Sequence, residues 1–296
     1  MLGVVNLDKP VGPTSHDMVA LLRRLTGDRR IGHAGTLDPL ASGVLPVLVG
    51  AATRFSEELT GGRKRYLATI RLGATSATDD GEGPIQPTGA PLPDDAAVRV
   101  ALAGMVGTFD QRPPAFSARK LAGRTAHRAA RAGDALELPA RRITVEGIDV
   151  LELAPQNDLL DVRIDLRCGP GTYVRSIARD LGEQLGCGGY LAALRRTEAA
   201  GLRVEDARTP EALEALRDAG RLAEAVLPVA DLLPLPRLAL SERDATRFRH
   251  GSRISVATPE SGRVAVLGAG DELLGVGRVA AGELQPEKVV ARQGEA

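Results

Sequence analysis

The segment G-H-A-G-T-L-D-P-L-A-S-G-V-L-P-V, residues 32–47, strongly restricts the backbone of this chain. Three glycines and two prolines surround one histidine and one acid, so the sequence predicts a tightly constrained loop with an apolar tail. An aspartate that precedes a proline, as Asp38 does, commonly caps a helix. A carboxylate held in so constrained a loop is equally suited to catalysis. The local pattern leaves both roles open for Asp38, and His33 is open between a structural imidazole and a functional one.

Composition limits the class of protein. The chain has 296 residues, 43% of them hydrophobic, which is enough for one large core and a smaller one. No apolar run approaches the roughly 18 residues of a membrane span, and the amino terminus lacks a basic region followed by an apolar one, so we expect a cytoplasmic protein. Cys168 and Cys187 are too far apart for a C-x-x-C motif, and we expect both in or near the core.

No phosphate-binding or dinucleotide fingerprint occurs in the chain, so we expect no nucleotide cofactor. Periodicity, caps and turn residues predict the main elements. They are a strand ended by Pro10, a helix from His16 to Leu25 capped by Thr14 or Ser15, a strand from Tyr66 to Leu72, a glycine-rich loop at 75–83, a helix within 94–106, a short arginine-rich helix at 126–132, a strand pair at 143–153 and 159–168, a helix from Tyr173 to Leu185, and a helix capped by Thr209.

The residue pattern of the chain changes at D-L-L-P-L-P-R, residues 231–237. Beyond it the sequence predicts one short helix and several short strands separated by glycines, which is typical of a small β-rich domain. We therefore predict two domains, 1–232 and 233–296.

Net charge is zero, but basic residues cluster. Residues 111–142 contain eight of them against Asp134 and Glu137: Arg112, Arg119, Lys120, Arg124, Arg128, Arg131, Arg141 and Arg142. The cluster fits either an ordinary solvated face or a surface that follows the phosphates of a polyanion.

Aromatic residues are scarce: the chain has three tyrosines, four phenylalanines and no tryptophan. Tyr66, Tyr173 and Tyr190 all lie beside glycine or basic residues. Each is open between a core ring and a platform for a nucleobase. Arg175 follows a glycine-rich turn at a predicted helix start, which suits an anion, although a surface salt bridge is the simpler reading.

Taken together, these segments resemble the TruB family, the bacterial tRNA pseudouridine-55 synthases. The resemblance rests on residues 32–47 and, in chain order, on G-V-V-N-L-D-K-P-V-G-P-T-S, K-R-Y, R-L-G-A-T-S-A-T-D-D-G, P-P-A-F-S-A-R-K-L-A-G, C-G-P-G-T-Y-V-R-S-I-A-R-D-L-G and L-A-A-L-R-R-T. The ordered set covers most of residues 3–200 and is far more specific than any one motif.

The resemblance implies an α+β fold, a mixed and largely antiparallel sheet with helices around a cleft, plus a small carboxy-terminal domain similar to a PUA domain. It implies isomerisation of uridine 55 in the T loop of tRNA, without a cofactor or metal and by a protein that we expect to be a monomer. Asp38 matches the essential aspartate, Arg175 its partner and Tyr66 the tyrosine that packs on the target base. Further matches line the uracil pocket or bind the RNA: Tyr173, Leu194, His33, Lys9, Lys64 and Lys120.

Two departures from the family pattern concern RNA contacts. His127 stands where the family usually has tyrosine, and Gly169-Pro170-Gly171 replaces a more polar tripeptide. Two other functions stay open from the residues alone. One is an RNA-binding protein that uses Asp38 only as a cap. The other is a nucleoside hydrolase, which would want a second carboxylate beside the bond, for which Asp79 and Asp80 in their glycine-rich loop are poor candidates.

Overall fold

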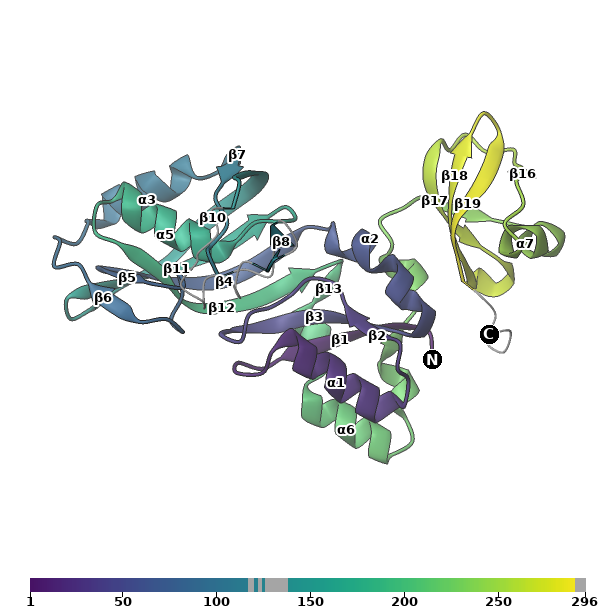
Figure 1. Cartoon of the computed structure of the whole chain (residues 1–296), viewed down its shortest axis with the longest axis horizontal. Helices are drawn as coiled ribbons and strands as arrows, with labels where there is room; N and C mark the ends of the chain where they lie inside the picture. The colour runs from purple at the N-terminus through teal and green to yellow at the C-terminus, as the bar shows by residue number, and fades with distance from the viewer. Residues whose placement is uncertain (117–119, 122–123, 126–137, 291–296) are drawn as a thin grey trace.

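A large mixed sheet forms the centre of the molecule (Figure 1). The structure is a computed structural model, and it describes residues 1–116, 120–121, 124–125 and 138–290. In spatial order the strands are β14 (Val226–Leu227), β1 (Gly3–Lys9), β3 (Ala41–Val49), β12 (Gly189–Ala199), β4 (Lys64–Leu72), β11 (Leu159–Cys168), β10 (Arg141–Gln156) and β7 (Gly107–Gln111). Strand β2 (Ile31–His33) pairs with β3, and β13 (Leu202–Arg203) pairs with β12. Among the described pairs of this sheet only β3 with β12 is parallel, which confirms the predicted mixed, largely antiparallel sheet.

Successive side chains of β1 point alternately into two separate hydrophobic cores. Val5 and Leu7 belong to the core beneath the helices, whereas Val4 points to the other face and packs with Leu48 of β3. This period of two is what a strand buried on both faces requires. The large sheet is therefore covered on one face by helices and, over β1 and β3, on the other by the carboxy-terminal part of the chain.

The helices lie against the sheet in two pairs (Figure 1). Helices α1 (Ser15–Thr26) and α6 (Pro210–Asp218) lie beside β1, and α3 (Asp95–Gly104) and α5 (Val174–Gln184) lie beside β10 and β12. The predicted caps are confirmed for both helices of the first pair: Thr14 forms a capping box with Asp17, and Thr209 caps α6. The short remaining helices of this part are η1 (Gly50–Phe55), α2 (Ser56–Thr60), η2 (Val204–Asp206), η3 (Leu222–Ala225) and η4 (Val229–Leu232).

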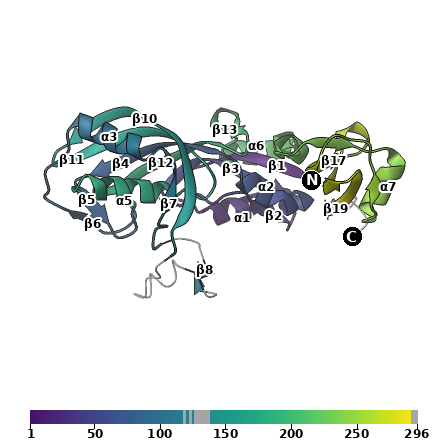
Figure 2. The ribbon, with the colours of Figure 1, turned by 90° about the horizontal axis from the view of Figure 1, so that it is seen from above.

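The predicted strand pair is confirmed as the β10–β11 hairpin. The glycine-rich segment at 75–83 is more ordered than predicted, because β5 (Ala74–Ser76) pairs with β6 (Ile85–Pro87) and closes it into a hairpin. Strand β8 (Lys120–Leu121) pairs with β9 (Arg124–Thr125) away from the large sheet (Figure 2). The helix predicted at 126–132 lies outside the described residues.

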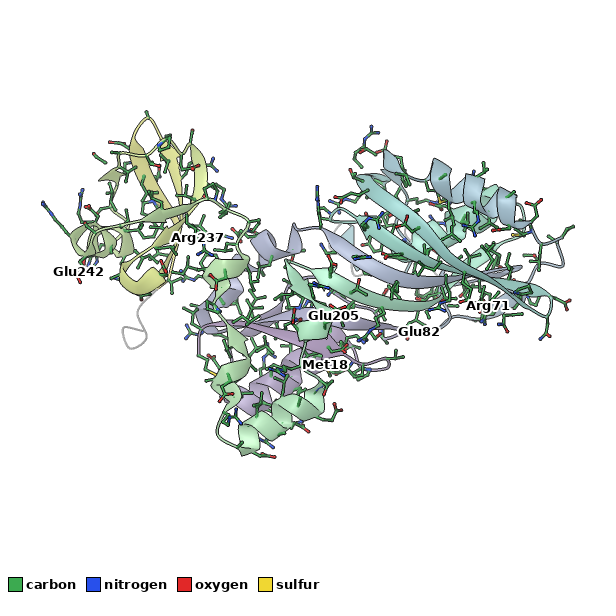
Figure 3. The ribbon with its side chains drawn as sticks, turned by 180° about the vertical axis from the view of Figure 1, so that it is seen from behind. Met18, Arg71, Glu82, Glu205, Arg237 and Glu242 are labelled. Carbon is green, nitrogen blue, oxygen red and sulfur yellow. The ribbon has the colours of Figure 1, made fainter. Side chains whose placement is uncertain are left out.

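A second, five-stranded sheet follows (Figure 2). Its order is β15 (Arg237–Ala239), β17 (Gly262–Leu267), β18 (Leu273–Ala280), β19 (Glu283–Val289) and β16 (Ile254–Ser255), with η5 (Ala269–Asp271) between β17 and β18. Helix α7 (Glu242–Arg249) inserts Phe248 into its core. Figure 3 labels Arg237 and Glu242 on this part and Met18 on the large one.

Both cysteines are free and buried, as predicted. Over the part of the chain that the structure covers, none of the helices has the length and apolarity needed to cross a membrane.

Candidate active site

Asp38 lies in the loop between β2 and β3, and the next element is a strand. No helix starts there in the described residues, so the capping role is excluded. The loop is pinned from α1: the Ser15 hydroxyl donates to the Leu37 carbonyl at 2.8 Å and accepts from the Leu37 amide at 2.8 Å. A turn follows, in which the Ala41 amide donates to the Asp38 carbonyl at 3.0 Å. The constrained loop therefore presents a carboxylate without using it for secondary structure.

Lys9 contacts the backbone on and beside this loop. Its Nζ donates to the carbonyls of Pro10 at 2.8 Å and Pro13 at 2.7 Å, and lies 3.5 Å from that of Pro39, the residue after Asp38. Burial lowers the pKa of Lys9 to about 8, against the opposing effect of the Asp38 charge. The side chain is fully buried, which argues against the predicted contact with RNA. Lys9 instead fixes the backbone beside the carboxylate.

Arg175 is the partner of Asp38, as predicted. Its Nη2 lies 3.0 Å from Asp38 Oδ2, and its side chain is 7% exposed against 39% for Asp38. The guanidinium also reaches Asp80 Oδ2 at 3.4 Å and the Thr78 carbonyl at 3.2 Å through Nη1. The surface salt bridge considered from the sequence is thus excluded, because the arginine is buried and held on two sides. One end of the Asp38 carboxylate is fixed while the rest faces solvent.

The start of α5 is fixed by a side chain that the sequence did not single out. Gln111 of β7 donates through Nε2 to the Tyr173 carbonyl at 3.0 Å and accepts from the Tyr173 amide at 2.9 Å. This two-bond contact takes the place of a side-chain cap, which Tyr173 lacks. It fixes the start of the helix two residues before Arg175.

Asp80, considered from the sequence only as a poor candidate for a hydrolase carboxylate, is the second acidic partner of Arg175. It is fully buried, Thr78 and the Glu82 amide donate to its Oδ1, and its backbone bridges to Leu191 of β12. The loop predicted to be open is folded over Arg175. Asp80 is buried, and its oxygens are taken up by Arg175, Thr78 and the Glu82 amide, which argues against a role as the second carboxylate of a hydrolase.

A cavity of about 270 Å³ opens beside Asp38. It brings together Asp38, Arg175, Tyr66, Tyr173, Leu194 and Lys64 with residues that were not predicted: Gly35, Thr36, Leu37, Thr60, Gly171, Thr172, Val174 and Arg196. Acidic, aromatic and apolar groups thus meet in one space, which suits a planar polar ring attached to a sugar.

Tyr66 and Arg196 form the floor of this cavity. They are opposite one another on β4 and β12, and both are buried. Arg196 donates through Nε to the Val44 carbonyl at 2.7 Å and through Nη2 to the Gly35 carbonyl at 3.0 Å, so it braces the Asp38 loop. Burial raises the pKa of Tyr66, which keeps its hydroxyl protonated, and the nearby Arg196 charge opposes that rise. The R-R-T motif was part of the resemblance, but nothing in it distinguished Arg196 from the partly exposed Arg195.

Glycine is required at position 43, where β3 passes close to Arg196 of β12. Gly43 of β3 has φ +100°, and a Cβ there would lie 2.1 Å from the Arg196 carbonyl oxygen. The third glycine of residues 32–47 therefore permits the parallel pairing of β3 with β12.

Lys64 and His33 line two cavities that share Thr60. Lys64 Nζ donates to the carbonyls of Thr60 and Gly62, both at 2.8 Å, and burial together with Arg196 lowers its pKa to about 8. His33 lies in a second cavity of about 490 Å³ that shares Thr60 and Gly171 with the first. Its Nδ1 is buried without a partner among the described residues, and burial lowers its pKa.

The predicted RNA-binding segment is only partly described. Arg141 and Arg142 line the second cavity together with His33. Gly171, from the tripeptide that differs from the family pattern, lines both cavities. Lys120 contributes backbone to β8, and its side chain lies outside the described part, as does His127.

We expect Asp80→Asn to lower the single-turnover rate constant of the chemical step about tenfold, because the neutral amide removes the negative charge that pairs with the second side of Arg175. Rapid-quench assays at saturating RNA measure it. Asp79→Asn is the matched control: it lies in the same loop, bonds Arg179 at 2.9 Å, and has a φ of 60° that asparagine tolerates. Equal losses in the two variants would contradict a specific role for Asp80.

Comparison with known proteins adds independent information. Three family models match successive parts of the chain: "TruB family pseudouridylate synthase (N terminal domain)" at 23–174, "tRNA pseudouridylate synthase B C-terminal domain" at 175–234, and "Pseudouridine synthase II TruB, C-terminal" at 236–290. The chain is 43% identical to a tRNA pseudouridine synthase B of Burkholderia mallei, covering 97% of this chain and 96% of the relative. It is 45% identical to that of Thermobifida fusca, covering 98% of each.

A solved structure is also similar over almost the whole chain. It is an H/ACA ribonucleoprotein bound to a substrate RNA containing 2′-deoxyuridine, with a TM-score of 0.73 and 25% identity over 99% of this chain and 86% of the other.

Proposed function

This chain belongs to the TruB family of pseudouridine synthases, and we propose that it isomerises uridine 55 in the T loop of tRNA to pseudouridine with Asp38 as the essential carboxylate. The observation that carries the proposal is the half-exposed Asp38, held by the buried Arg175 at 3.0 Å and facing a cavity that Tyr66 also lines. The test is to incubate the protein with unmodified tRNA and to map pseudouridine along the product.

The reaction breaks the bond from C1′ to N1, turns the detached uracil and joins its C5 to C1′. One carboxylate suffices, by three routes: Asp38 attacks the sugar, attacks the base, or removes a sugar proton to give a glycal-like intermediate. Every route needs the carboxylate ionised. Arg175 holds one side of the Asp38 carboxylate at 3.0 Å and leaves the other side open to the substrate.

We propose that Tyr66 packs on the flipped uracil and that Tyr173 and Leu194 wall its pocket. Apolar walls let the detached ring rotate, because they offer no fixed hydrogen bonds to trap it. The hydroxyl of Tyr66 is buried next to Arg196 and stays protonated, so it can accept the proton from C5 only as it releases its own.

Removing the base from the stack of the T loop costs a few kcal/mol, which contacts to the RNA backbone offset. We assign those contacts to Lys64, Lys120, His33 and the basic 111–142 segment, and we reassign Lys9 to positioning. Arg141 and Arg142 beside His33 support a path for the RNA along the second cavity. We further propose that residues 1–232 are the catalytic domain and 233–296 a PUA-like RNA-binding domain, since a separate sheet begins at β15.

No oxidation state changes in the isomerisation and no energy input is needed, so we propose that the reaction runs without a cofactor or metal. We also propose a monomer that works in the cytoplasm. The RNA-binding protein without catalysis is disfavoured, because Asp38 caps no helix and is held by the buried Arg175 beside a cavity.

The affinity for tRNA should fall as pH rises through about 8, where Lys64 loses its proton and its charge. One proton taken up on binding gives at most about a tenfold loss of affinity per pH unit above that value. Lys64→Arg keeps its charge and should bind with less dependence on pH between 7 and 9. Filter binding measures the affinity of both proteins. The pKa of Lys9 is also about 8, but Lys9 is present in both proteins and so cannot cause a difference between them. Parallel curves would exclude Lys64 as a phosphate ligand.

Lys120→Ala should weaken tRNA binding and reduce the slope of log affinity against log salt by about 0.7 to 0.9, the effect of one lost phosphate contact. The rate constant at saturating tRNA should change less than about threefold. Arg24→Ala is the control, since Arg24 is an exposed arginine that pairs with Glu214 on α6. A large loss of rate with an unchanged salt slope would place Lys120 in the chemistry instead.

A further inference from the structure

One buried carboxylate of the large domain is held by the small sheet. Glu58 of α2 is 3% exposed at its side chain. It forms an ion pair with Arg263 of β17, and both its oxygens accept from Lys288 of β19, at 2.9 and 3.0 Å. Burial alone would raise the pKa of Glu58, but the hydrogen bonds from Lys288 and Arg263 hold it below its ordinary value.

The ion pairs lie at the edge of a wider contact. Lys288 Nζ also donates to the Arg54 carbonyl at 2.9 Å, and Arg54 donates back to the Val289 carbonyl at 2.6 Å. Beneath them Phe55 and Leu59 share a core with side chains of the small sheet, among them Leu267, Leu273, Val276 and Val290. The small sheet is therefore seated on η1 and α2.

The same short helix leads directly to the active-site cavity. Helix α2 ends at Thr60, two residues after Glu58, and Thr60 lines both cavities. Its carbonyl accepts from Lys64 Nζ at 2.8 Å, and Lys64 lines the cavity that holds Asp38. A shift of α2 would move one wall of the site, because one helical turn joins the ion pair to that wall.

We propose that Glu58 is a positioning residue, through which docking of the carboxy-terminal domain fixes the Thr60 and Lys64 wall of the active-site cavity. This rests on the proposed function of that cavity. The carboxy-terminal domain then acts in the chemical step as well as in RNA capture. Glu57, the neighbouring carboxylate, is 88% exposed and lies 3.5 Å from Lys288, so it carries little of this contact.

The test compares Glu58→Gln with the control Glu272→Gln, which removes a carboxylate that pairs with Arg249 at 2.7 Å inside the carboxy-terminal domain. Single-turnover pseudouridine formation is measured at saturating full-length tRNA and at saturating T stem-loop RNA, together with affinity for each. We expect Glu58→Gln to lower the rate constant about tenfold on both RNAs, with affinity for the stem-loop changed less than about threefold and the control unchanged. Loss of affinity for full-length tRNA alone, with normal rate constants, would overturn the proposal, because the ion pair would then only orient the domain.

A second readout does not depend on catalysis. Acetylation of the Lys64 amine by a small reagent, followed by mass spectrometry, should be faster in Glu58→Gln because the contact with the Thr60 carbonyl loosens. An unchanged rate of acetylation would overturn the proposal. If the wild type made no pseudouridine but Lys64 still responded, the proposed function would fail while the positioning role stood.

Arg263→Gln provides the same test from the small domain and keeps the proposal falsifiable if Glu58→Gln does not fold. It leaves Glu58 paired with Lys288, so we expect a smaller loss on both RNAs. The double variant Glu58→Gln with Arg263→Gln should be no slower than Glu58→Gln alone, since both changes break one contact. Independent, multiplying losses would contradict a shared contact.

Discussion

Asp38→Asn is expected to lower the single-turnover rate of pseudouridine formation by at least about 10⁴-fold, while tRNA affinity changes by no more than about threefold. Asparagine keeps the shape of the side chain and can still accept from Arg175 Nη2, which lies 3.0 Å from the carboxylate. It cannot act as a nucleophile or as a base. All three routes to pseudouridine are therefore closed at the first step, whereas the surface that meets the RNA is unchanged.

Asp38→Glu separates charge from position. It restores the negative charge but moves the carboxylate by one methylene, away from the place that the loop and Arg175 fix, so we expect it to remain at least about 10²-fold slower than the wild type. Rapid-quench kinetics with a filter-binding assay on each variant provide the measurement. Equal loss of binding and turnover in Asp38→Asn would show that Asp38 holds the fold of the site and not the chemistry.

Arg175→Lys should lower the rate constant by about 10² to 10³-fold. The guanidinium contacts Asp38 through Nη2, and it contacts both Asp80 and the Thr78 carbonyl through Nη1. A lysine ammonium group cannot reproduce that planar arrangement. Stability should fall as well, by ~1–3 kcal/mol, because a buried acceptor loses its donor. Thermal denaturation and rapid-quench assays measure the two effects.

Arg179→Lys is the matched control, since Arg179 lies one turn further along α5 and binds Asp79 and Asp180 instead. We expect its rate constant to stay within about threefold of the wild type. A similar slowing in both variants would mean that α5 as a whole, and not the contact with Asp38, supports the reaction.

The backbone of the site was largely predictable. Local signals placed β1, the Thr14 cap of α1, the β10–β11 hairpin and the start of α5, because alternation, capping residues and glycine turns act over a few neighbouring residues. The role of Asp38 was not decidable from those signals. It came from the ordered set of motifs.

Contacts between residues that are far apart in the sequence could not be predicted from it. Asp80 lies in a segment rich in glycine and polar residues, which predicts an exposed loop, yet the hairpin of β5 and β6 buries it against Arg175. The resemblance implied that Lys9 contacts the RNA, but its side chain is buried, and its amine donates to the carbonyl of Pro13 and lies 3.5 Å from that of Pro39, a residue distant in the sequence. Neither outcome is encoded in a short window.

Buried positive charges support the backbone around Asp38. Lys9, Arg175 and Arg196 each donate to main-chain carbonyls around the Asp38 cavity. Arg196 also donates to the Gly35 carbonyl and Arg175 holds the Asp38 carboxylate itself, so these contacts restrict the loop that presents Asp38. Preorganisation of this kind is what a reaction with a single carboxylate requires.

The most direct test of the central claim is tritium release from an unmodified tRNA transcript labelled with [5-³H]uridine, compared with a transcript that carries cytidine at position 55. Formation of pseudouridine must expel the hydrogen from C5, so the wild-type protein should release tritium from the first transcript, up to one equivalent per tRNA, and none from the second. No release from the first transcript by protein that is folded and binds it, or equal release from both, would contradict isomerisation of uridine 55.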